Sequence, residues 1–309
     1  MPFQEIEKYK SLGFYARQVV EGYLTGLHHS PFHGFSVEFA EHRLYNPGES
    51  TRHIDWKLYG RTDKLFVKRY EEETNLRCHL IVDHSSSMYF PLERQGNMQQ
   101  PNKLTFSIYA AAVLVELLVR QRDAFGLTLF SDGVDLQTDV RSSGAHQQYL
   151  YSLLEQQLLP VKADSLQKRG TRIADTLHIM AEKMHRRSLV VLFSDVFVDP
   201  REREPLWDAL RHLRHCKHEV LIFHTYDRDK ELLLNYGSRP VEFVDLEGSR
   251  RVKVFPGEVA DRYRDTVESQ FAELKHNALM YNIDYIPVDV GEGFDRIMME
   301  YFSKRNRMR

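Results

Sequence analysis

The sequence predicts an α/β protein with a doubly wound, mostly parallel sheet and an N-terminal β-rich extension. After Asn75, short apolar runs alternate with segments of helical periodicity. The runs are nearly continuous, as in strands that are covered on both faces. Before Asn75, polar and apolar residues alternate with a period of two, which indicates half-exposed strands. We expect three parts: an extension at 1–76, an α/β domain at 77–291, and a C-terminal helix with a basic tail at 292–309.

The apolar runs of the central domain are expected strands, and periodic segments between them are expected helices. The strands are His79–Val82, Phe125–Phe130, Leu189–Phe193, Val220–Phe223 and Tyr285–Val290. The helices are Lys103 to Arg122, a segment from Thr171, and one with Pro205 in its first turn. Val241–Val244 and Val252–Val254 read as a hairpin-like insertion before the last helix and strand. In the extension we expect a helix within 3–27 and strands at 36–39 and 64–68.

Composition limits the classes of function. The chain has 309 residues, and 42 basic against 44 acidic side chains give a net charge of −2. Residues 1–75 carry ten basic and eleven acidic side chains, so no basic footprint for nucleic acid is expected. Two cysteines cannot build a disulfide framework and suit a reducing compartment. With no signal-like N-terminus and no apolar run long enough to span a membrane, we expect a cytoplasmic protein.

Oxygen-bearing side chains follow several of the expected elements. Asp83, Ser85 and Ser87 form an Asp-x-Ser-x-Ser pattern after the first strand, Thr171 precedes a helix, and Asp195 follows the strand Leu189–Phe193. A doubly wound sheet places its ligands beyond the carboxyl ends of the strands. Hydroxyl and carboxylate oxygens suit Mg²⁺ or Mn²⁺ and not a structural zinc. The same residue types are also typical of helix caps and turns, which is the alternative interpretation.

This set resembles the metal-ion-dependent adhesion site of von Willebrand factor A domains, a Rossmann-type fold. The resemblance implies that Asp83, Ser85, Ser87, Thr171 and Asp195 hold Mg²⁺ or Mn²⁺, with the serine hydroxyls binding directly. It further implies that a carboxylate on a partner protein completes the coordination, so the site would serve binding and not catalysis. Val196 departs from the pattern, because many adhesion-type domains have glycine after the last aspartate.

A dense motif in the extension is more specific. It comprises 36–41, Arg43, Tyr45, 47–49, Arg52, 54–57, 61–63, 67–69 and 71–76. These residues resemble the signature of the bacterial family known as domain of unknown function 58, which joins such a segment to a von Willebrand factor A-like domain. The resemblance covers about residues 30 to 290. It implies an adaptor or co-chaperone that works with a MoxR-type AAA+ ATPase in the assembly or maturation of protein complexes.

Three other chemistries compete with metal-bridged binding. A Mg²⁺- or Mn²⁺-dependent phosphoester hydrolase would use Asp83 and Asp195 to hold the ion, but the sequence shows no clear general base. His84 beside Ser85 suggests a serine hydrolase, although adjacent residues of an extended chain point to opposite sides. The histidines at 212, 215 and 218 around Cys216 suggest zinc, or simply a solvated helix end.

Overall fold

The computed structural model describes residues 11–28, 42–44, 56–62, 64–68, 76–95, 99–160, 171–196, 203–247, 251–294 and 298. The contacts between residues divide the chain into two compact units. One unit joins Met1–Tyr23 to Leu76–Arg309, and the other is Leu24–Asn75. The candidate site lies entirely within the first, larger unit.

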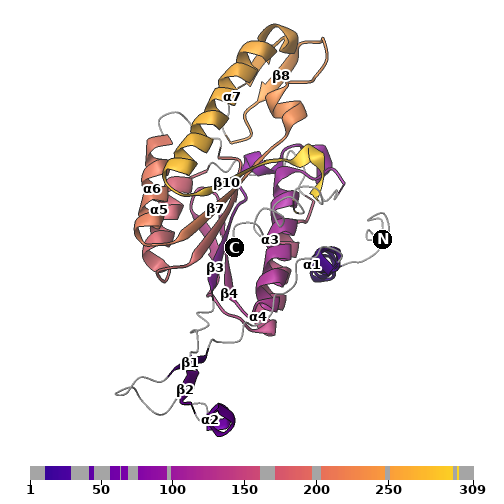
Figure 1. The fold of residues 1–309 in the computed structure, drawn as a ribbon. Helices are drawn as coiled ribbons and strands as arrows, with labels where there is room; N and C mark the ends of the chain where they lie inside the picture. The colour runs from indigo at the N-terminus through magenta and orange to yellow at the C-terminus, as the bar shows by residue number, and fades with distance from the viewer. Residues whose placement is uncertain are drawn as a thin grey trace. The chain divides into compact units, whose positions relative to one another are not determined.

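A six-stranded sheet forms the centre of the larger unit (Figure 1). Its strands are β3 (Arg77–Asp83), β4 (Ala124–Phe130), β5 (Val134–Gln137), β6 (Leu189–Ser194), β7 (Glu219–Tyr226) and β10 (Asp284–Asp289). Their spatial order is β10-β7-β6-β3-β4-β5, and every neighbouring pair is parallel except β4 and β5. The five expected strands are therefore confirmed, and the antiparallel edge strand β5 was not predicted.

Helices cover both faces of this sheet (Figure 1). On one face lie α3 (Lys103–Arg120) and α4 (Gly144–Gln157), and on the other lie α5 (Ile173–Lys183) and α6 (Arg203–His215). The helix α1 (Leu12–His28) joins α4 through its first residue, because the Leu12 N–H donates to Glu155 Oε1 at 2.8 Å. The long helix α7 (Pro256–Met280) begins with proline, which suits a first helical turn. A mixed α/β architecture with a mostly parallel sheet is thus confirmed.

The helix α3 is almost wholly buried, as its near-continuous apolar sequence predicts. Its start is fixed by Asn102, whose side chain accepts from the Thr105 N–H at 2.7 Å and donates to the Tyr89 carbonyl at 3.0 Å. The second contact ties the helix to the loop after β3. The first residue of α3 is Lys103, and this start of the helix places it beside Asp195, the residue after β6.

Two smaller β structures complete the described chain. The expected insertion is confirmed as an antiparallel pair, β8 (Val241–Val244) and β9 (Arg251–Val254). In the second unit, β1 (His42–Leu44) pairs antiparallel with β2 (Phe66–Lys68), and the helix α2 (Trp56–Thr62) lies between them in sequence. The strand expected at 36–39 and most of the C-terminal helix and tail lie outside the described residues. None of the described helices has both the length and the apolar character that a bilayer crossing requires.

Candidate functional site

The centre of the sheet contains a topological switch point between β3 and β6. From β3 the chain continues to the neighbouring strand β4, whereas from β6 it continues to β7 on the opposite side. Connections that leave in opposite directions open a crevice at the carboxyl ends of such strands, where doubly wound proteins bind ligands. Asp83 is the last residue of β3, and Asp195 follows the last residue of β6. Both predicted carboxylates therefore lie at this switch point, and we use the word crevice for this place.

Asp83 is fully buried and rigidly held. Its Oδ1 accepts the Ser85 N–H at 2.9 Å, and its Oδ2 accepts the Ser194 hydroxyl at 2.7 Å. Burial, together with the nearby charge of Asp195, raises the pKa of Asp83 to about 7. A nearby cation would favour the ionised form of this carboxyl group.

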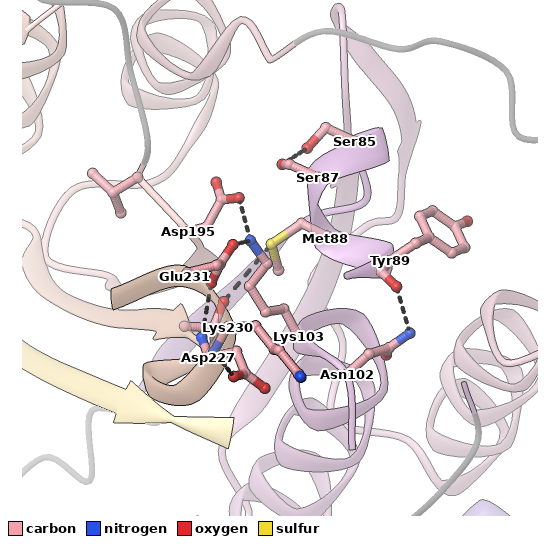
Figure 2. A network of polar contacts seen from close by, with 12 residues as sticks. Ser85, Ser87, Met88, Tyr89, Asn102, Lys103, Asp195, Asp227, Lys230 and Glu231 are labelled. Carbon is pink, nitrogen blue, oxygen red and sulfur yellow. Dashed lines mark hydrogen bonds and ion pairs between the residues drawn. The ribbon is translucent and has the colours of Figure 1, made fainter. Parts of the chain in front are cut away.

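Ser85 and Ser87 place two hydroxyls beside each other at the start of a single 3-10 turn, Ser86–Tyr89 (Figure 2). Their Oγ atoms are 3.2 Å apart. Neighbouring oxygens around an octahedral Mg²⁺ with bonds of about 2.1 Å lie about 3 Å apart. The separation therefore suits two adjacent ligands of one such ion.

Asp195 is paired with a buried lysine that the sequence reading did not select. Lys103 Nζ donates to Asp195 Oδ2 at 2.9 Å and to Glu231 Oε1 at 2.6 Å (Figure 2). Burial disfavours the charged forms, but Lys103 holds the pKa of Asp195 below its usual value, and the two carboxylates raise the pKa of Lys103. The nearby Ser87 hydroxyl also acts to lower the pKa of Asp195. Lys103 thus offsets part of the negative charge at the crevice.

A second ion pair holds Glu231, the other carboxylate that binds Lys103, through Asp227. Asp227 pairs with Arg94 at 2.5 Å, and the Asp227 N–H donates to Glu231 Oε2 at 2.7 Å. These contacts lie in and next to a single-turn π-helix, Arg228–Leu232. A signal for Lys103 existed in the sequence, because a lysine at the positive N-terminal end of an otherwise apolar helix needs a carboxylate partner.

Val196 adopts a conformation that favours glycine. Its φ of 48° lies in the left-handed region, where a β-branched side chain costs roughly 1–2 kcal/mol. The Val196 N–H donates to the Ser194 hydroxyl at 3.0 Å, and the side chain is buried in the core. Val196 therefore adopts the backbone conformation that glycine would adopt after Asp195, and the valine side chain adds strain there.

Thr171 faces an acidic side chain from the insertion. Its hydroxyl donates to Glu247 Oε1 at 3.0 Å, and the nearby hydroxyls of Ser85 and Ser87 act to lower the pKa of the same carboxyl group. Neither Ser85 nor Thr171 caps a helix. Ser85 makes no capping bond, and the residue at the α5 N-cap is Arg172. Glu247 therefore binds Thr171 beside Ser85 and Ser87, and no sequence motif would have selected it.

The competing histidine chemistry is not supported by the geometry. His84 Nε2 is 2.8 Å from Asp135 Oδ2, so its ring is directed to β5 and not toward Ser85. His212 Nδ1 faces His178 Nδ1 at 3.1 Å, and the buried His218 accepts the Ser188 N–H. Among the described residues, no three His, Cys, Asp or Glu side chains are grouped to hold a metal ion. A cation at the crevice would therefore depend on hydroxyl oxygens as well as carboxylates.

The fold and crevice define an α/β protein with a polar site at the centre of a mostly parallel sheet. Residues 41–276 match the family described as "Protein of unknown function DUF58", and the chain belongs to this family. The uncharacterized proteins Rv1480 of Mycobacterium tuberculosis and Mb1516 of Mycobacterium bovis are each 26% identical over 229 residues. These matches cover 72% of this chain and 66% of each relative, just under two thirds of their length.

Solved structures show weaker likeness. The conserved hypothetical protein BatB from Bacteroides thetaiotaomicron is 15% identical with a TM-score of 0.43, over 75% of this chain and 99% of that one. An aerotolerance-related membrane protein from Bacteroides fragilis is 17% identical with a TM-score of 0.42. The match covers 74% of this chain and 99% of that one. These scores are below the level at which a shared fold would follow.

Proposed function

We propose that this chain is a non-enzymatic, metal-dependent protein-binding module whose site is the crevice between β3 and β6. The observation that carries the proposal is the placement of Asp83, Ser85, Ser87 and Asp195 where β3 and β6 end, with two serine oxygens 3.2 Å apart. Thr171 joins this group through its hydrogen bond to Glu247. Hydroxyls and carboxylates are the ligand types that Mg²⁺ or Mn²⁺ accepts.

The charge balance of this site favours binding over hydrolysis. Lys103 engages one oxygen of Asp195, and Ser194 engages one oxygen of Asp83. Both carboxylates are thereby fixed in place by hydrogen bonds, as suits a rigid binding site. An ion held by such a set would remain electrophilic and would attract a carboxylate from a partner.

The partner we propose is a MoxR-type AAA+ ATPase, with this chain as its adaptor or co-chaperone in the assembly or maturation of protein complexes. Support comes from the resemblance of the N-terminal motif to the family signature and from membership of the family. We place the complex in the cytoplasm, where the free cysteines Cys78 and Cys216 would remain reduced.

Two measurements test the metal and the partner together. Calorimetric titration with Mg²⁺ should give saturable binding to the wild-type chain and a loss of about tenfold or more in affinity for Ser85→Ala. Capture of a purified MoxR-type ATPase from the same organism should fall in EDTA and with Asp83→Asn. The exposed Asp139→Asn serves as the control. Capture that is unchanged by EDTA and by Asp83→Asn would show that no metal bridge exists.

The hydrolase alternative is tested by a turnover assay with generic phosphoesters in Mg²⁺ and in Mn²⁺. We expect no turnover above that of the Asp195→Ala variant. Turnover that disappears in Asp195→Ala would favour the enzyme instead.

A further inference from the structure

Glu247 lies in the connection between β8 and β9, which is part of the insertion before α7. The hairpin is in continuous register from Val241 opposite Val254 to Val244 opposite Arg251. At the start of its loop, the Glu247 N–H donates to Asp245 Oδ1 at 3.0 Å, which bends the chain locally. Glu247 thus follows the end of β8 by three residues.

The side chain of Glu247 reaches the carboxyl ends of the central strands. Thr171 donates to Oε1 at 3.0 Å, and the Ser85 and Ser87 hydroxyls lie close enough to act on the pKa of the same carboxyl group. Burial and the charge of Asp195 raise the pKa of Glu247, while the three hydroxyls oppose that rise. The carboxylate of Glu247 is thereby held by Thr171, next to the pair of serine hydroxyls at the turn that follows β3.

The chemistry of this contact matches that of the proposed partner. In metal-bridged binding, a carboxylate from outside approaches the same hydroxyl-lined position and completes the shell of the ion. Glu247 is a carboxylate at that position, supplied by the same chain. Because Lys103 offsets the charge of Asp195, a further carboxylate would also strengthen the hold on a divalent ion.

We propose that Glu247 is an internal ligand, which completes the metal site in a closed resting state and is displaced by an acidic side chain of the partner. This inference rests on the proposed function, because it assumes that the crevice takes Mg²⁺. It adds that the β8–β9 loop regulates the site and that the partner presents an exposed aspartate or glutamate.

The first experiment is Mg²⁺ calorimetry on the full chain and two variants. Glu247→Gln keeps the shape and one acceptor oxygen for Thr171 but removes the charge, so we expect the affinity for Mg²⁺ to fall about tenfold. Glu242→Gln is the control, because Glu242 is an exposed residue of the same hairpin, and this change should leave the affinity for Mg²⁺ unchanged. Equal affinities of the wild-type chain and Glu247→Gln would overturn the internal ligand.

The second experiment supplies the loop in trans. A labelled peptide of residues 241–254 should bind Glu247→Gln in Mg²⁺ at least about tenfold more tightly than it binds the wild-type chain, whose own loop competes at a high effective concentration. Binding should vanish in EDTA and with a peptide that carries glutamine at the position of Glu247. Equal peptide binding by the two chains would also overturn the proposal.

The two proposals fail in different ways. If no chain binds Mg²⁺, the metal-dependent function is wrong and the internal ligand falls with it. If every chain binds Mg²⁺ equally and the peptide does not distinguish them, only the internal ligand is wrong and the metal site stands.

Discussion

Lys103 and Asp195 form an ion pair at 2.9 Å in which both side chains are almost completely buried. Glu231 accepts from the same ammonium group at 2.6 Å. A lysine that bridges two carboxylates under the crevice keeps Asp195 ionised without solvent. The pair therefore sets the charge that the crevice offers to any ligand.

Removal of this lysine should be strongly destabilising. Lys103→Met would leave two carboxylates without their counter-ion, so we expect the free energy of unfolding to fall by about 3–5 kcal/mol. Urea denaturation at neutral pH measures the loss. Arg141→Met is the control, because its exposed pair with Asp139 should contribute less than about 1 kcal/mol. A loss for Lys103→Met no larger than that of the control would contradict a buried, charged bridge.

Ser194 connects the two central strands through its hydroxyl. It donates to Asp83 Oδ2 at 2.7 Å and accepts the Val196 N–H at 3.0 Å, and all of these groups are buried. We expect Ser194→Ala to lower the free energy of unfolding by about 1.5–3 kcal/mol, since a carboxylate loses a buried donor. Chemical denaturation of the wild-type chain and the variant measures this difference in the free energy of unfolding.

The matched control for that change is Ser107→Ala. The Ser107 hydroxyl is also buried, but it donates only to a backbone carbonyl of its own helix. Its removal should cost less than about 1 kcal/mol. Equal losses for the two variants would show that the bond to Asp83 carries no special weight.

His79 should make stability depend on pH. Burial, with added repulsion from His218, His185 and Arg77, lowers the pKa of His79 to about 4. In the unfolded chain its pKa is about 6.5, so between pH 6.5 and pH 4 the unfolded state binds a proton that the folded state refuses. Its contribution is therefore fully present above pH 6.5 and is lost as the pH falls through this window.

The measurement compares the wild-type chain with His79→Gln across that window. The difference in unfolding free energy should change by up to about 1.4 kcal/mol per pH unit, with the wild-type chain losing more as the pH falls. His218 also has a lowered pKa, but it is common to both chains and its contribution cancels to first order. Parallel pH profiles would contradict a depressed pKa of His79.

Much of this protein followed from local sequence pattern. Continuous apolar runs placed β3, β4, β6 and β7, because strands that are covered on both faces need apolar residues throughout. The edge strand β10 is only partly buried, but its sequence was still long enough to be recognised. The edge strand β5 was not predicted, since it is only four residues long and its residues alternate between half-buried and exposed. The pattern at Asp83, Ser85 and Ser87 was visible for a similar reason, because all three residues lie at the end of one strand.

The tertiary structure decided which distant residues join that pattern. Lys103 reaches Asp195 across 92 positions of sequence, and Glu247 reaches Thr171 across 76. Neither pairing has a local signature, because both depend on the order of strands in the sheet and on where the insertion folds back. The sequence by itself therefore determined the strands and the hydroxyl-bearing end of the sheet, while only tertiary packing decided that a lysine and a glutamate meet there.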